Sequence, residues 1–197
     1  MLLLTGVGIG ALGGLGLRTP SSTAGPLRPP GASTEAEFLS ACIRCAQCVA
    51  VCPVDALQSV GVSNLRQLAT PAVSDPRTSP CNLCQGHDSL LCIDACPTTA
   101  LEPVADWTAV RMGVAVIDRD LCLPWHGTTC RACWHACPFP NEAIKLDWRT
   151  RPEIIEEACV GCGLCAHVCL TEPGSIEIRP QSAWRAGDPT HVGGDEG

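Results

Sequence analysis

The residues of this chain whose types and spacing could do chemistry are its sixteen cysteines, which stand in a sequence of 197 residues. They form four groups of four, and in every group three residues separate the last two cysteines. The first and fourth groups have the plain spacing C-x2-C-x2-C-x3-C, whereas the second and third contain a seven-residue gap. In chain order the groups are Cys42, Cys45, Cys48, Cys52; Cys81, Cys84, Cys92, Cys96; Cys122, Cys130, Cys133, Cys137; and Cys159, Cys162, Cys165, Cys169.

The plain spacing is typical of iron–sulfur proteins. C-x2-C-x2-C-x3-C-P is the bacterial ferredoxin run, in which the fourth cysteine binds a second cluster. Two-residue gaps let one loop wrap a cube and offer three thiolates to three irons. The three-residue gap places the fourth cysteine about one helical turn further on, pointing elsewhere. The spacing therefore predicts that all sixteen cysteines are ligands and that the chain holds four [4Fe–4S] clusters.

Zinc sites and disulfide bonds are the alternatives. Zinc would use C-x2-C pairs at a longer separation, often with histidine. Disulfide bonds are conceivable in an exported protein, but disulfide scaffolds rarely repeat one tight pattern four times. Four histidines lie within the cysteine groups, and we interpret them as loop residues because each group already has four cysteines. They are His87, His126, His135 and His167.

The rest of the composition favours an electron carrier over an enzyme. The formal net charge is −7 and Lys145 is the only lysine, so nothing resembles a basic face for nucleic acid. No serine–histidine–acid set, phosphate loop or dinucleotide fingerprint is present. Because passing single electrons requires no acid, base or nucleophile, we expect no catalytic residue and an electron-transfer subunit of an oxidoreductase system.

The elements that must position the cysteines follow a repeated unit of strand, cysteine loop, short helical turn and strand. Residues 114–117 and 154–155 are predicted strands before the third and fourth groups, and residues 143–146 and 175–178 alternate like half-buried strands. The expected fold class is α+β, with two ferredoxin-like 2[4Fe–4S] modules that are rich in loops. Since aromatic residues are only 4% of the chain, we expect bound metal to organise the interior.

The chain divides into four parts. Residues 1–24 contain an uncharged apolar run, which predicts an export signal whose basic start lies upstream. Residues 25–40 are predicted to form a stiff Pro-rich linker and a short helix that begins with a Thr34–Glu37 capping box. Residues 41–180 form the expected four-cluster double ferredoxin domain, and residues 181–197 form a loose tail.

The sequence resembles the NapG/MauM group of ferredoxin-type proteins over nearly its whole length. The matching features are the x7 gap after Cys122, the fourth group without a following proline, and three short segments. These segments are Leu27-Arg28-Pro29-Pro30-Gly31-Ala32, Cys42-Ile43-Arg44-Cys45-Ala46-Gln47-Cys48 and Arg111-Met112-Gly113.

The resemblance implies a periplasmic protein exported in folded form by the twin-arginine route, although the printed sequence has no twin arginine. It would be associated with the inner membrane through its partner or an uncleaved signal. That partner would be a polytopic membrane ferredoxin of NapH or MauN type that oxidises quinol. Electrons would pass to a periplasmic redox partner such as the nitrate reductase system, whereas MauM-type relatives accompany methylamine oxidation. The cysteine plan also resembles the four-cluster electron-transfer subunit of a molybdenum oxidoreductase, which remains an alternative.

The pairing of the four groups is a separate prediction. The first and fourth groups are both plain and the second and third both have the long gap, so similar loops favour a nested pairing. The molybdenum-enzyme subunits that the chain resembles are paired in that way. The predicted ligand sets are Cys42, Cys45, Cys48 with Cys169; Cys159, Cys162, Cys165 with Cys52; Cys81, Cys84, Cys92 with Cys137; and Cys122, Cys130, Cys133 with Cys96.

Overall fold

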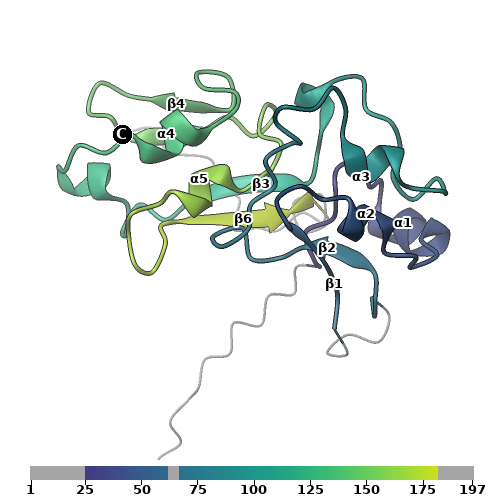
Figure 1. The fold of residues 1–197 in the computed structure, drawn as a ribbon. Coiled ribbons are helices and arrows are strands. Elements are labelled where there is room, and N and C mark those ends of the chain that lie inside the picture. The colour runs from purple at the N-terminus through teal and green to yellow at the C-terminus, as the bar shows by residue number, and fades with distance from the viewer. Residues whose placement is uncertain (1–24, 62–66, 182–197) are drawn as a thin grey trace, which may run out of the picture.

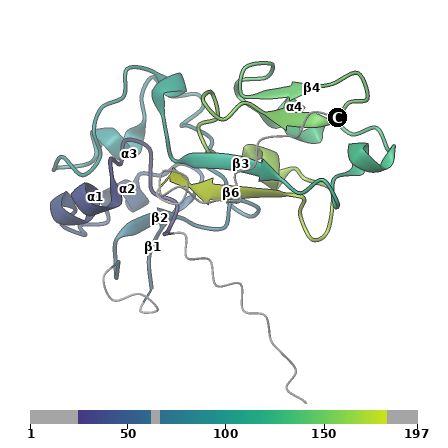
Figure 2. The same ribbon diagram turned by 180° about the vertical axis from the view of Figure 1, so that it is seen from behind.

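The computed structural model describes residues 25–61 and 67–181, so the predicted export signal and all but the first residue of the predicted tail lie outside the described residues. Figures 1 and 2 show two halves, one around α2 and α3 and the other around α4 and α5. The helices are α1 (Glu35–Ala41), α2 (Gln47–Ala50), α3 (Leu91–Asp94), α4 (Ala132–Ala136) and α5 (Leu164–His167), with 3-10 turns η1 (Trp107–Ala109) and η2 (Leu123–His126). The strands are β1 (Leu57–Ser59), β2 (Pro71–Val73), β3 (Gly113–Ile117), β4 (Ile144–Leu146), β5 (Pro152–Ile154) and β6 (Ile176–Pro180). None of the described helices is both long and apolar enough to cross a membrane.

The strands pair in the same way in both halves. In the C-terminal half β3 and β6 form an outer antiparallel pair, and β4 and β5 form an inner hairpin. In the N-terminal half β1 and β2 form the inner hairpin, and a single antiparallel bridge between Ala32 and Leu101 stands where the outer pair would be. Each half therefore contains two consecutive cysteine groups joined by its inner hairpin. The α+β prediction with two ferredoxin-like modules is confirmed.

The predicted strands of the C-terminal module are confirmed with small shifts in their ends. Residues 114–117 and 143–146 coincide with β3 and β4 to within one residue, and residues 175–178 correspond to β6. The predicted strand at 154–155 is β5, which begins two residues earlier. Strand β2 was not predicted from the sequence. It has three residues and begins with Pro71, which gives little periodic signal.

The segment before the first cysteine group is part of the core, so the prediction of a linker is wrong. Leu27 and Arg28 are only 6% and 7% exposed, and Pro29 and Pro30 are fully buried. The Arg28 guanidinium donates to both carboxylate oxygens of Glu35 at 2.8 and 2.6 Å, and it also donates to the Pro71 carbonyl at 2.9 Å. A Pro-rich segment can pack against the core of a domain instead of connecting two separate parts. Here the hydrogen bonds of Arg28 connect α1 to β2.

Helix α1 begins as the sequence predicts. Thr34 is its N-cap, and the Thr34 side chain and the Glu37 side chain each bond to the other's backbone amide in a capping box. Phe38 is 1% exposed, and the Arg28 guanidinium lies 4.7 Å from the centre of its ring. The lead-in helix is therefore fixed on both sides, by its cap and by the buried arginine.

Two close backbone contacts join the modules. The Cys81 amide donates to the Cys162 carbonyl at 2.9 Å, and the Met112 amide donates to the Val160 carbonyl at 3.2 Å. Between them Gly161 has φ +73°, and a Cβ there would lie 2.4 Å from the Gly113 amide nitrogen. The second and fourth cysteine groups are thus held against each other through main-chain atoms.

Candidate metal centres

Each of the four predicted helical turns is present and has the same relation to its cysteines. The third cysteine of every group lies within α2, α3, α4 or α5, and the fourth follows the end of that helix by one or two residues. These third cysteines are Cys48, Cys92, Cys133 and Cys165. Because the fourth cysteine comes about one turn later, its thiol is directed away from the loop that holds the first three.

The N-terminal module brings its eight thiols into two sets. The thiolates of Cys42, Cys96 and Cys45 act electrostatically on Cys48, which defines site 1. Cys52 acts on both Cys81 and Cys84, and those two act on Cys92. Site 2 is therefore Cys81, Cys84, Cys92 and Cys52.

The C-terminal module repeats this plan around two cavities. One cavity is lined by the thiols that define site 3, which are those of Cys159, Cys162, Cys165 and Cys137. The other cavity is lined by the thiols that define site 4, which are those of Cys122, Cys130, Cys133 and Cys169.

These positions contradict the nested pairing. Cys52 lies with Cys81 and Cys84 instead of the fourth group, and Cys137 lies with the fourth group instead of the second. Cys96 lies with the first group instead of the third, and Cys169 with the third instead of the first. The reason is the inner hairpin of each module, which returns the chain so that consecutive groups face each other. Loop length, on which the nested prediction rested, does not decide which groups meet.

Burial governs the protonation of the thiols. Burial, followed by the charge of neighbouring thiolates, raises the pKa of Cys48 and Cys133 to about 11 and that of Cys81 and Cys162 to about 12. A buried thiolate needs a cation beside it, and bound iron supplies that charge. Four thiols that surround a common cavity are the donor set of a [4Fe–4S] cluster, so the residues present fit this group.

Two of the fourth cysteines behave differently. Burial raises the pKa of Cys169, but hydrogen bonds with the side chains of Ser175 and Thr171 outweigh it and lower this pKa to about 7. Burial likewise raises the pKa of Cys96, and hydrogen bonds with the Thr98 backbone and hydroxyl lower it below its usual value. These hydroxyl residues were not predicted from the sequence. A signal is visible in retrospect, since a threonine stands two places after Cys96 and Cys169.

The four sites follow one another in an unbroken series. Cys48 of site 1 acts electrostatically on Cys92 of site 2, and Cys81 of site 2 acts on Cys162 of site 3. Cys133 of site 4 acts in turn on Cys165 of site 3. The order in space is therefore 1, 2, 3, 4, although the order of the groups in the chain is different.

Apolar side chains are exposed at both ends of this series. At site 1, Ile43 is 63% exposed and the neighbouring Cys45 is itself exposed. At site 4, Leu170 is 72% exposed and stands where the other three groups have proline. Sites 2 and 3 are the interior members of the series.

The alternatives to iron–sulfur ligation were zinc and disulfide bonds. All sixteen cysteines are described and each is a free thiol. Among the described residues, no three His, Cys, Asp or Glu side chains gather as the ligands of a single metal ion do. The ligands of a [4Fe–4S] cube, by contrast, bind four different iron atoms. His126 and His167 form hydrogen bonds with the backbone carbonyls of Asp120 and Arg77.

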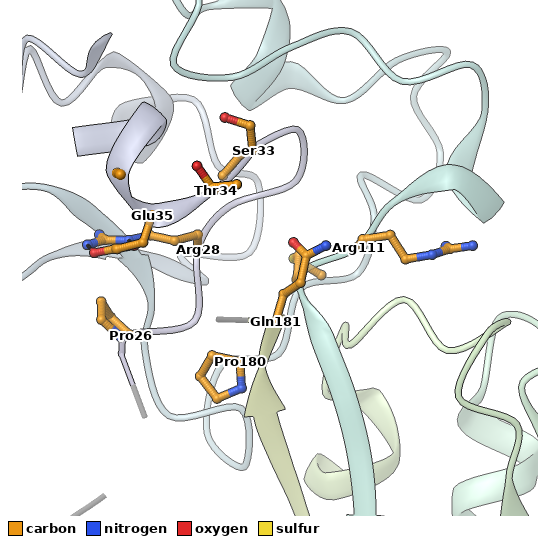
Figure 3. Close-up of a pocket in the computed structure, with 11 residues that line it drawn as sticks. Pro26, Arg28, Ser33, Thr34, Glu35, Arg111, Pro180 and Gln181 are labelled. Atoms are coloured by element: carbon orange, nitrogen blue, oxygen red, sulfur yellow. Dashed lines mark hydrogen bonds and ion pairs between the residues drawn. The ribbon is translucent and has the colours of Figure 1, made fainter. Parts of the chain in front are cut away.

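A further cavity contains no cysteine. Figure 3 shows it between the start of the described chain and the end of β6, with Arg28 directed toward Glu35 and the Arg111 guanidinium extending away from them. Since Arg28 and Glu35 already neutralise each other at 2.6 Å, this cavity presents no free charge from that pair to a ligand. The chemistry of the described residues is concentrated at the thiol sites.

Comparison with known proteins agrees with this geometry. Two family models, each described as a 4Fe-4S dicluster domain, match residues 41–100 and 115–177. These ranges are the two modules, each with two consecutive cysteine groups. The match therefore supports 4Fe-4S clusters as the cofactor of both modules.

Complete proteins from several bacteria are similar over most of the chain. "Ferredoxin-type protein NapG" of Escherichia coli is 36% identical over 90% of this chain and 82% of its own length. "Methylamine utilization ferredoxin-type protein MauM" of Methylophilus methylotrophus is 38% identical over 82% of this chain and 74% of its own length. The MauM protein of Paracoccus denitrificans is 35% identical over 89% of this chain and 83% of its own length.

Proposed function

Because this chain belongs to the NapG/MauM family of ferredoxin-type 4Fe-4S proteins, we propose that it is a four-cluster electron relay. One [4Fe–4S] cluster would be held at each of sites 1 to 4. A bound cluster accepts and releases one electron at a time without forming or breaking a bond to a substrate. The sixteen cysteines would bind the clusters, and this role requires no catalytic residue.

The observation that carries this proposal is the unbroken series of thiol sites. Interior sites 2 and 3 adjoin at Cys81 and Cys162, because the Cys81 amide donates to the Cys162 carbonyl at 2.9 Å and the Cys81 thiolate raises the pKa of Cys162. With clusters bound at all four sites, an electron that enters at one end could therefore reach the other without leaving the protein. The exposed ends, near Ile43 and Leu170, are where redox partners would approach.

The physiological direction that we propose is from a membrane quinol dehydrogenase to a periplasmic reductase system such as nitrate reductase. The donor would be a polytopic membrane ferredoxin of NapH or MauN type. Support comes from family membership and from the uncharged apolar run in residues 2–17, which favours export to the periplasmic face. A role in methylamine oxidation is the second candidate, because relatives with that name are equally similar to this chain.

The molybdenum-enzyme alternative rested on the resemblance of the cysteine plan, and subunits of that class pair their cysteine groups in a nested way. The four sites of this chain pair consecutive groups, which counts against that alternative. The relay proposal therefore stands on the geometry of two consecutive dicluster modules.

The first test is chemical. Protein purified without oxygen should be brown and contain about 16 iron atoms with equal acid-labile sulfide, four per cluster. A colourless, zinc-loaded and folded protein would refute the proposal.

The second test is functional. Quinol should reduce the protein only in membranes that contain the polytopic partner, with partner-free membranes as the control. Turnover of nitrate or methylamine by the isolated chain would contradict the role of a carrier.

A further inference from the structure

Two hydroxyl groups contact a thiol of site 4. The Cys169 sulfur lies 3.2 Å from Ser175 Oγ and 3.3 Å from Thr171 Oγ1. Ser175 is only 3% exposed, so its hydroxyl is withdrawn from water. Thr171 Oγ1 also accepts a hydrogen bond from the Ser175 amide at 2.8 Å, which fixes the two side chains relative to each other.

The donor in these contacts is determined once Cys169 binds iron. An iron-bound thiolate carries no proton, so both hydroxyls must donate to the sulfur. Hydrogen bonds to cluster sulfurs are one of the factors that set the reduction potential. Reduction adds a negative charge, and donors directed at the sulfur stabilise the more negative state. The two hydroxyls therefore favour the reduced form of a cluster at site 4.

Site 3, in the same module, has no such arrangement among the described residues. Its fourth ligand Cys137 is followed by Pro138 and Phe139, neither of which has a hydroxyl. Its thiols receive hydrogen bonds from the backbone: the Ala115 amide is 3.5 Å from the Cys159 sulfur, and Phe139 and Leu164 form backbone hydrogen bonds with Cys137 and Cys162. Site 3 also lies between sites 2 and 4, and a buried position disfavours the added charge. Both differences lower its potential relative to site 4.

We propose that Ser175 and Thr171 are potential-setting residues that make site 4 the more readily reduced centre of the C-terminal module. This inference rests on the proposed electron relay and adds a direction to it. With a cluster bound at each site, one electron would leave the cluster at site 3, which would be oxidised, and the cluster at site 4 would be reduced. Electrons would then collect at the exposed end that carries Leu170, where the acceptor would dock. Site 1 has a weaker counterpart, because Thr98 Oγ1 is 3.6 Å from the Cys96 sulfur.

The test is a redox titration of the intact, cluster-loaded protein followed by electron paramagnetic resonance. The site 4 signal is identified as the one that Cys133→Ala removes. In Ser175→Ala its midpoint potential should shift to more negative values, and Thr171→Val should shift it in the same direction. Ser74→Ala is the matched control, because the Ser74 hydroxyl is also buried but has no hydrogen-bond partner. This control should leave all midpoints unchanged.

The outcomes separate the inference from the proposed function. Wild-type protein without iron would contradict the relay and the inference together. Loaded Ser175→Ala and Thr171→Val proteins with wild-type midpoints would overturn the inference alone. If neither variant assembles the site 4 cluster while Ser74→Ala does, the hydroxyls are needed to build the site, and the potential-setting role is likewise wrong.

Discussion

The pairing of consecutive cysteine groups can be tested by counting intact clusters in two double variants. Both variants share Cys52→Ala and both remove two cysteines in total. In the first, the second substitution is Cys84→Ala, and in the second it is Cys165→Ala. The structure places Cys52 and Cys84 in the same site but Cys52 and Cys165 in different sites.

The expected magnitudes follow from four thiols per site. With sixteen thiols in four sites, Cys52→Ala/Cys84→Ala removes both of its ligands from site 2 and should leave about three intact [4Fe–4S] clusters. Cys52→Ala/Cys165→Ala damages sites 2 and 3 and should leave about two. A cube that loses one ligand either falls apart or keeps three irons, and in both cases it leaves the intact count.

Mössbauer spectroscopy of iron-57-enriched protein supplies that count, with iron per chain as an independent measure. The nested pairing predicts the opposite result, because it places Cys52 with Cys165 and apart from Cys84. Three intact clusters in the Cys165 variant and two in the Cys84 variant would therefore refute the assignment of sites 2 and 3.

Three further predictions concern stability. Arg28→Met should lower the free energy of unfolding by about 2–3 kcal/mol, which is less than the cost of breaking a fully buried ion pair because the Glu35 side chain is 24% exposed. Urea denaturation should show this loss, and Arg44→Met, at an exposed arginine, should be nearly neutral as the control. Equal urea midpoints for the two variants would contradict the prediction. Gly161→Ala should lower the melting temperature more than Gly86→Ala, because both glycines have positive φ but only a Cβ at position 161 would meet backbone atoms, at 2.4 Å. Equal shifts in melting temperature would count against the close contact of the modules. Removal of iron by a chelator should unfold the protein and abolish its near-ultraviolet circular dichroism, because the cysteines that would hold the iron are part of the core. A near-ultraviolet signal that persists after iron removal would refute this prediction.

Local features were predictable from the sequence because short-range spacing determines them. A three-residue gap between cysteines sets a helical turn, and all four turns are present in α2 to α5. A short apolar segment marked β3, alternating side chains marked β4 and β6, and the Thr34–Glu37 pattern marked the start of α1. In each case the signal and the structure lie within a few residues of each other.

The pairing of the groups could not be predicted from loop lengths because it depends on contacts between distant residues. The inner hairpins β1–β2 and β4–β5 decide which groups face each other, and β2 has almost no sequence signal. The Pro-rich segment was misjudged for a related reason. Its burial depends on the Arg28 contacts with Thr70 and Pro71, more than forty residues away in the sequence.

The two modules share one backbone plan but differ in the hydrogen bonds made to their cysteine sulfurs, and this difference bears on function. Two identical modules joined end to end would give a series of sites without preferred direction. Here a hydroxyl contacts the fourth cysteine of each terminal site, Cys96 and Cys169, but not that of either interior site among the described residues. The contacts at Cys169 are also shorter and more numerous than the one at Cys96. In the proposed relay, the polarity would therefore come from side chains two to six residues beyond the ligand, which can change without altering any cysteine.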